Sequence, residues 1–154
     1  MDRRWRDVGV LVAALFVVNV VARLIIRFGF EGDDTAAGRV SLAMFAVIGL
    51  ILAVVAFRWG RLRPLADWAA DMALVVGVAM ALTLLVGPLL VAYNPFADGA
   101  ATFLAQIGFY LLAAGAGVLI GYLVLTALGR DYRSWQLKRY AEVKAAKPRR
   151  VVRR

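Results

Sequence analysis

Four long apolar stretches dominate the chain, at residues 8–29, 40–57, 72–93 and 101–128. A bilayer core is about 30 Å thick and a helix rises 1.5 Å per residue, so roughly 20 apolar residues cross it. Apolar residues make up 63% of the 154 residues, well above the roughly 45–50% of an ordinary soluble domain. The sequence therefore predicts an all-α integral membrane protein, built as a bundle of four transmembrane helices.

The four stretches and their loops fit one membrane domain, residues 1–129, followed by a basic segment, residues 130–154. A basic start before an apolar stretch is also typical of a cleaved signal peptide. The first stretch is long, however, and a cleavage site near Val20-Val21-Ala22 would lie next to Arg23. We therefore expect it to remain as the first transmembrane helix.

The distribution of Lys and Arg predicts the orientation, because cytoplasmic loops of membrane proteins are enriched in them. Three arginines precede the first stretch, three lie between the second and third, and ten basic residues follow the fourth, of 19 in all. Tryptophan prefers the membrane interface, and one flanks the same end of each stretch: Trp5, Trp59, Trp68 and Trp135. The sequence thus predicts a multi-pass protein of the cell membrane with both termini in the cytoplasm.

Small residues recur at three- and four-residue spacing within the apolar stretches. Helices in lipid associate where small side chains let their backbones approach. We expect packing within the bundle, or alternatively against another subunit, at Ala46, Gly49, Ala53, Ala73, Gly77, Ala81, Ala113, Gly117 and Gly121.

The first stretch contains a polar stripe, Asn19, Arg23 and Arg27, spaced so that all three share one helical face. Ionisable residues inside a membrane segment are functional candidates. One interpretation is a site for an anionic headgroup or phosphate, with the arginines as donors. The alternative is that both arginines extend toward the headgroups and are neutralised by acids of the following loop, Glu31, Asp33 and Asp34.

Two further features concern the third stretch. Asp67 and Asp71 share one face at its start, and we expect structural ion pairs with nearby Arg58, Arg61 and Arg63. Gly87-Pro88 lies in its second half, where proline removes an amide donor and predicts a kink.

The basic C-terminal segment predicts an amphipathic helix followed by a disordered tail. Tyr132, Trp135, Tyr140 and Val143 fall within a shared arc, which is typical of helices that lie on anionic membrane surfaces. A protein partner is an alternative for this segment, and nucleic acid is a weaker one. Membrane-surface contact is expected from Trp135, Lys138, Arg139, Tyr140, Arg149 and Arg150.

Catalytic chemistry has little support in the sequence. The chain contains no His and no Cys, and it has no nucleotide-binding or nucleophile motif. We therefore expect no enzyme activity, no cofactor and no metal. The favoured interpretation is an accessory, assembly or regulatory component of a membrane complex, with another membrane protein or a second copy as partner. The alternative is a small homo-oligomeric transporter or channel for an anionic solute or lipid, using Asn19, Arg23 and Arg27.

Overall fold

The computed structural model describes residues 3–30, 33–94, 96–97 and 99–146. These residues form helices joined by short turns: α1 (Arg3–Gly29), α2 (Asp34–Leu62), α3 (Leu65–Ala81), the π-helical turn η1 (Leu82–Val86), α4 (Gly87–Leu90), α5 (Gly99–Ala127) and α6 (Tyr132–Ala146). The predicted tail from residue 147 onward, including Arg149 and Arg150, lies outside the described residues.

Four helical segments are long and apolar enough to span a membrane, as the sequence predicts: Arg4–Gly29, Asp34–Leu62, Leu65–Leu90 and Gly99–Ala145. Each begins before its apolar stretch, whereas the third ends at Leu90, before the predicted end at residue 93. Helix α2, for example, begins six residues before Val40 and is capped by Asp33, whose carboxylate accepts a hydrogen bond from the Ala36 amide at 3.0 Å. The limits of an apolar stretch therefore do not mark the limits of its helix.

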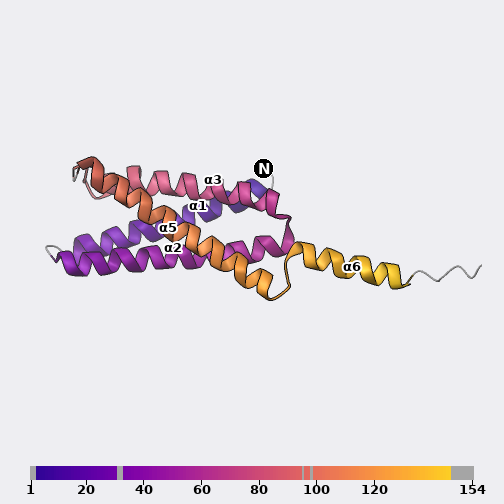
Figure 1. Cartoon of the computed structure of the whole chain (residues 1–154). Helices are drawn as coiled ribbons and strands as arrows, with labels where there is room; N and C mark the ends of the chain where they lie inside the picture. The colour runs from indigo at the N-terminus through magenta and orange to yellow at the C-terminus, as the bar shows by residue number, and fades with distance from the viewer. Residues whose placement is uncertain (1–2, 31–32, 95, 98, 147–154) are drawn as a thin grey trace, which may run out of the picture.

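Helix α5 crosses α2 near the middle of both, and the two helices diverge toward the end opposite α6 (Figure 1). We call the end of the bundle where α1 begins and α6 follows the terminal end. The opposite end, where α1 joins α2 and α4 joins α5, is the loop end.

At the crossing, the backbones of α2 and α5 touch. A Cβ atom added at Gly117 would lie 2.8 Å from the Cα of Gly49, and one added at Gly121 would lie 2.8 Å from the Cα of Ala53. Real Cβ atoms do not approach backbone so closely, so both positions of α5 must be glycine at this separation. Close backbone approach at small residues is how helices associate in lipid.

The small residues of α3 have a different environment. Ala73, Gly77 and Ala81 are exposed on the outside of the bundle, and open space surrounds the Cα of Gly77. Helix α3 instead turns another face inward, which carries Trp68, Met72, Val75 and Ala79. Ala46 of α2 is likewise exposed. The same sequence pattern therefore marks an internal contact on α5 and an uncovered face on α3.

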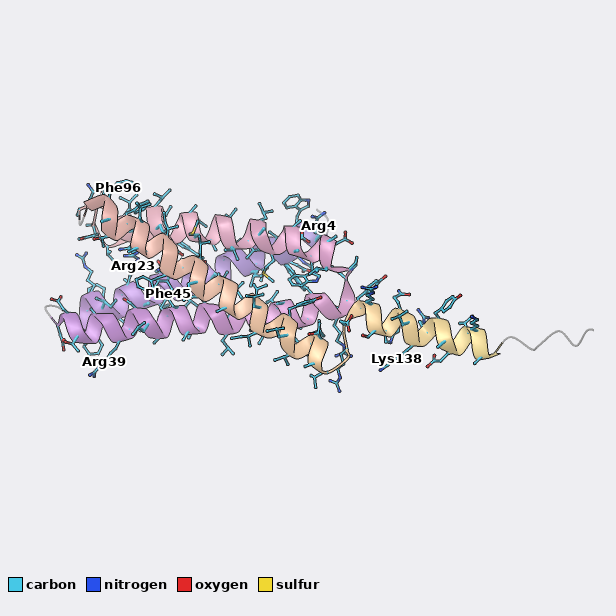
Figure 2. The ribbon with its side chains drawn as sticks, in the orientation of Figure 1. Arg4, Arg23, Arg39, Phe45, Phe96 and Lys138 are labelled. Carbon is cyan, nitrogen blue, oxygen red and sulfur yellow. The ribbon has the colours of Figure 1, made fainter. Side chains whose placement is uncertain are left out.

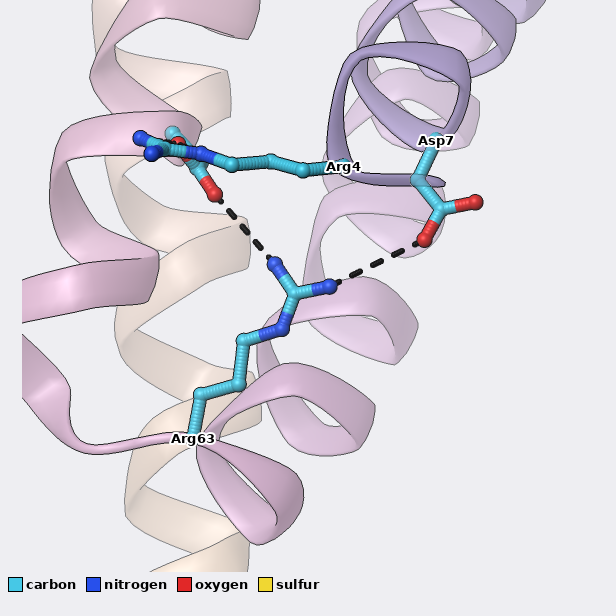
Figure 3. A network of polar contacts seen from close by, with 4 residues as sticks. Arg4, Asp7 and Arg63 are labelled. Atoms are coloured by element: carbon cyan, nitrogen blue, oxygen red, sulfur yellow. Dashed lines mark hydrogen bonds and ion pairs between the residues drawn. The ribbon is translucent and has the colours of Figure 1, made fainter. Parts of the chain in front are cut away.

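Ion pairs join α1, α3 and the link between α2 and α3 at the terminal end (Figure 3). The Asp71 carboxylate, only 4% exposed, accepts hydrogen bonds from Arg4 at 2.8 and 2.5 Å and from Arg63 at 3.3 Å. Arg63 also lies 3.8 Å from Asp7. The pairing of Asp71 with Arg63 confirms one predicted contact, whereas Arg4 is a partner that the sequence did not indicate.

Helix α6 leads away from the terminal end and continues roughly in the direction of the bundle (Figure 1). Trp135, Tyr140 and Val143 are exposed on it, and so is Leu137, which lies outside their arc. The Arg139 guanidinium lies 4.7 Å from the centre of the Trp135 ring. In this arrangement α6 makes little contact with the transmembrane helices, and its apolar side chains are free to meet another surface.

We expect Gly117→Ala to destabilise the protein by roughly 1–3 kcal/mol, because its new methyl group would force the backbones of α2 and α5 apart. Gly115→Ala is the matched control, since a Cβ there meets nothing within 4 Å. Thermal unfolding in one detergent measures both variants. Equal stability of the two would contradict the backbone contact described here.

Asp71→Asn should lower stability by roughly 1–2 kcal/mol, since a buried carboxylate would be lost beside two arginines that are themselves partly exposed. Asp67→Asn, an exposed position one turn earlier, should have a much smaller effect. Denaturant unfolding of the two variants tests this. A loss that is no larger for Asp71→Asn would show that the ion pairs do not hold this end of the bundle together.

Candidate functional site

A cavity of about 450 Å³ lies at the loop end, bounded by α1, α2, η1 and α5. Its polar lining consists of Asn19, Arg23, Ser41, Thr83 and Gln106, and its apolar lining consists of Ile26, Leu42, Met44, Phe45, Leu84 and Phe109, with Gly38 near the rim. Figure 2 shows Arg23 and Phe45 in the space between α2 and α5, whereas Arg39 points away from it. This volume falls within the usual range of small-molecule sites.

Asn19 forms the deepest polar contact of the cavity. Its side chain is 1% exposed and is held from two sides. The amide nitrogen Nδ2 donates to the Met44 sulfur at 3.1 Å, and the oxygen Oδ1 accepts from Arg23 Nε at 3.1 Å. Because both contacts restrain the amide, Asn19 fixes the direction in which the Arg23 side chain extends.

The second partner of Arg23 is a backbone carbonyl that the π-helical turn leaves without a helical donor. The Gly87 amide donates to the carbonyl of Leu82, five residues back, and not to Thr83 as an α-helix would require. The next residue, Pro88, has no amide hydrogen to offer. Arg23 Nη2 supplies the donor instead, 3.4 Å from the Thr83 oxygen. The predicted disturbance near Gly87-Pro88 therefore takes the form of a π-helical turn just before it.

Gly87 makes room for this arrangement. A Cβ atom there would lie 2.6 Å from Asn19 Oδ1 and 2.9 Å from Arg23 Nε. Gly87 has a helical backbone, so glycine is required here for the space it leaves and not for its conformational freedom. The positions of the Asn19 and Arg23 side chains thus depend on the presence of glycine at position 87, which is distant in the sequence.

The Arg23 side chain has no acidic partner among the described residues, where every ion pair involves Arg4 or Arg63 at the terminal end. Asp33, which was expected to neutralise it in one interpretation, caps α2. Glu31, expected in the same role, lies outside the described residues. A guanidinium has five N–H donors, and the two bonds described above use two of them, which leaves three in a side chain that lines the cavity.

Arg27 does not line the cavity, although it shares a helical face with Asn19 and Arg23. Its Nη1 donates to the carbonyl of Val91, where α4 ends. Ala92, the next residue, has a φ of 56°, so the chain turns sharply away from the helix there. The structure therefore brings Asn19 and Arg23 together in the cavity and places Arg27 at a helix end.

Two buried hydroxyl groups lie close to the same region. Thr83 is 2% exposed and Tyr110 is fully buried. The two side chains are near enough to interact weakly, but neither hydroxyl meets the geometry of a hydrogen bond with any described residue. Buried polar groups are rarely left unpaired. Thr83 is a lining residue of the cavity, and its buried hydroxyl lies beside that of Tyr110.

The sequence patterns did not indicate Ser41, Thr83, Gly87 or Gln106 as parts of a site. Pro88 indicates that a backbone carbonyl of the preceding turn lacks its donor. In an α-helix that carbonyl belongs to Leu84, and only in a π-helical turn does it belong to Thr83. The sequence does not indicate which of the two turns forms.

The cavity has groups that can bind a ligand. Within the part of the chain that the structure describes, its lining contains one charged side chain, three neutral polar side chains besides Thr83, and no carboxylate. Among the described residues, no group of three or more Asp or Glu side chains is placed to hold a metal ion. A cation with free N–H donors beside neutral hydrogen-bonding groups is suited to an anion.

No family model matches this chain, and neither a curated protein nor a solved structure resembles it significantly.

Gly87→Ala should separate Asn19 from Arg23, because the new methyl group would occupy the space of their hydrogen bond. We expect the Arg23 Nε–H hydrogen to exchange with water faster in Gly87→Ala than in the unaltered chain. Nitrogen NMR measures this exchange, and the Arg23→Lys variant, which lacks the signal, identifies it. Gly77→Ala, an open position on the same transmembrane segment, is the control and should leave that signal unchanged. Unaltered exchange in Gly87→Ala would contradict the packing around Arg23.

Proposed function

We propose that this protein is a multi-pass protein of the cell membrane that binds an anionic headgroup or solute through Asn19 and Arg23. The observation that carries the proposal is an arginine in a membrane-spanning helix that is oriented by an amide and a carbonyl and has no carboxylate among the described residues. Charged side chains within transmembrane helices are costly and are retained for function. An anionic ligand would compensate the Arg23 charge.

The proposed orientation places both termini in the cytoplasm. It rests on the concentration of Lys and Arg at the terminal end and in the C-terminal segment, since 16 of the 19 basic residues fall there. The cavity then opens toward the outer half of the membrane, and α6 extends on the inner side. The exposed aromatic and basic residues of α6, including Trp135, Lys138 and Tyr140, would contact anionic lipid there.

The proposed activity is binding without covalent chemistry. A general acid or base would require a titratable group within hydrogen-bond reach of the substrate, and Arg23 does not release its proton at any physiological pH. The other polar groups of the cavity are hydroxyls and amides. Among its lining residues, no general base lies beside a hydroxyl to activate it as a nucleophile.

Replacing Arg23 by Gln tests the proposal, because it removes the charge and leaves a shorter, neutral side chain that can still donate a hydrogen bond. We expect retention of an anionic phospholipid or of phosphate to fall about 10- to 100-fold, as expected for losing roughly 1.5–3 kcal/mol of charge-assisted hydrogen bonding. Native mass spectrometry of the purified full chain in a non-ionic detergent provides the measurement.

Arg39→Gln is the matched control, because Arg39 is an exposed arginine near the same end of the bundle and does not line the cavity. Arg39→Gln should bind anions as tightly as the unaltered protein does. The melting temperatures of both variants should lie within a few degrees of that of the unaltered protein. If the two substitutions weaken binding equally, surface charge explains it and the proposed site does not exist.

A second candidate function is that of an accessory component that docks onto another membrane protein. It is favoured by the exposed small-residue face of α3 and by an apolar groove of about 510 Å³ between α3 and α5, which includes Ala73. Small residues on a lipid-facing surface permit close packing of a partner helix.

Gly77→Leu should dissociate such a complex while leaving the isolated bundle as stable as before, since the position is open. Affinity purification from the native membrane, compared between this variant and Gly9→Leu at an open position of α1, measures the loss of an unlike partner. Recovery of the same partner with both variants, or of none with the unaltered protein, would argue against this function.

A further inference from the structure

We infer that the ligand of the cavity is an anionic membrane lipid that enters sideways between α2 and α5, with its headgroup at Arg23 and an acyl chain along Phe45 and Phe109. The inference rests on the proposed function, since it names the ligand class of the same site. It is distinguished from the alternative source of the same chemistry, a free phosphate-like anion that enters from water.

The cavity is too large and too apolar for a small anion alone. Its volume of about 450 Å³ compares with the roughly 30 Å³ that one water molecule occupies in the liquid. Six of its lining side chains are apolar and come from all four walls, so a hydrated anion would lose water without gaining polar partners over most of the surface. An amphiphile with one charged end and an apolar chain matches both parts of the lining.

The opening lies on the side of the bundle, where lipid would surround it. Leu42 of α2 and Phe109 of α5 both line the cavity, yet they are 69% and 60% exposed. They lie on the two helices that diverge toward the loop end (Figure 1). The Phe45 and Phe109 rings, 6.5 Å apart at their centres, are in aromatic contact and close the space between α2 and α5 at their level. A chain could therefore enter on the loop-end side of this ring pair, beside Leu42, without separating the backbone contact near Gly49 and Gly117.

The polar groups have the positions that such a lipid requires. Arg23 lies six residues before the end of α1, about 9 Å along the helix axis, which is within reach of a phosphate at headgroup depth. Thr83 lies on the opposite wall, and Gln106 lies on the α5 wall. Ser41 lies on the α2 wall, where its hydroxyl donates to the Ala37 carbonyl at 3.0 Å. Polar side chains thus come from four elements around one charged end.

The experiment is a native mass spectrometry titration of the full chain in a non-ionic detergent with three probes. These are phosphatidylglycerol, phosphatidylcholine with the same acyl chains, and glycerol phosphate, which carries the anionic headgroup without the chains. The proteins compared are the unaltered chain, Arg23→Gln, Phe109→Ala and, as the control for an exposed apolar residue of α5 outside the cavity, Leu112→Ala.

We expect phosphatidylglycerol to bind the unaltered chain at least tenfold more tightly than phosphatidylcholine, and Arg23→Gln to remove this preference. Phe109→Ala should weaken phosphatidylglycerol binding at least threefold, whereas Leu112→Ala should not. Glycerol phosphate should neither bind nor displace the lipid at a hundredfold excess. Circular dichroism and melting temperatures identify any variant that fails to fold, in which case Phe109→Leu replaces Phe109→Ala.

The outcomes separate the two proposals. If glycerol phosphate binds in an Arg23-dependent manner and Phe109→Ala leaves lipid binding unchanged, the lipid inference is wrong and the proposed anion site stands. If no probe distinguishes the unaltered chain from Arg23→Gln, both are wrong.

Discussion

The contact between the backbones of α2 and α5 determines the shape of the whole bundle. Because Gly117 and Gly121 rest against Gly49 and Ala53, these helices are in close backbone contact, and side-chain contacts continue from Phe45 and Phe109 on one side to Gly60 and Leu125 on the other. Toward the loop end the two helices diverge, and the polar cavity lies there between α1, α2, η1 and α5, whereas the apolar groove lies between α5 and α3. The hydrophobic effect cannot close such spaces in a membrane, since lipid chains fill them equally well.

The candidate site depends on a sequence of local consequences that begins with Pro88. Proline has no amide hydrogen, and the π-helical turn before it moves the Gly87 donor to Leu82, so the Thr83 carbonyl lacks a backbone donor. Arg23 provides that donor, and Asn19 fixes the side chain that does so. The absence of a side chain at Gly87 leaves space for both. One irregular turn thus provides a hydrogen-bond acceptor that fixes the orientation of an arginine within a transmembrane helix.

The helices and their approximate limits could be predicted from the sequence, because apolar length is a strong constraint in a membrane. The equal spacing of Asn19, Arg23 and Arg27 correctly places them on one face of α1. It could not indicate that Arg27 would bond to the end of α4, because that contact depends on how two helices pack.

The small residues illustrate the same limit of sequence reasoning. Gly117 and Gly77 belong to similar patterns, yet one is buried against backbone and the other is exposed. Spacing shows which helices can approach a partner closely, and only the fold shows which of them do. The Arg4–Asp71 pair, joined across 67 positions of the chain, was beyond local patterns for the same reason.

If α1 spans the membrane as proposed, the depth of Arg23 would make the binding of an anion sensitive to voltage. Moving an elementary charge fully across a membrane at 100 mV involves about 2.3 kcal/mol. A charge about 9 Å inside a core of about 30 Å experiences roughly a third of that, or about 0.7 kcal/mol, whichever way the protein is inserted. A monoanion held beside Arg23 would cancel this energy. The filled and empty forms would then respond differently to an electric field, and membrane potential would become one of the variables that set how often the cavity is occupied.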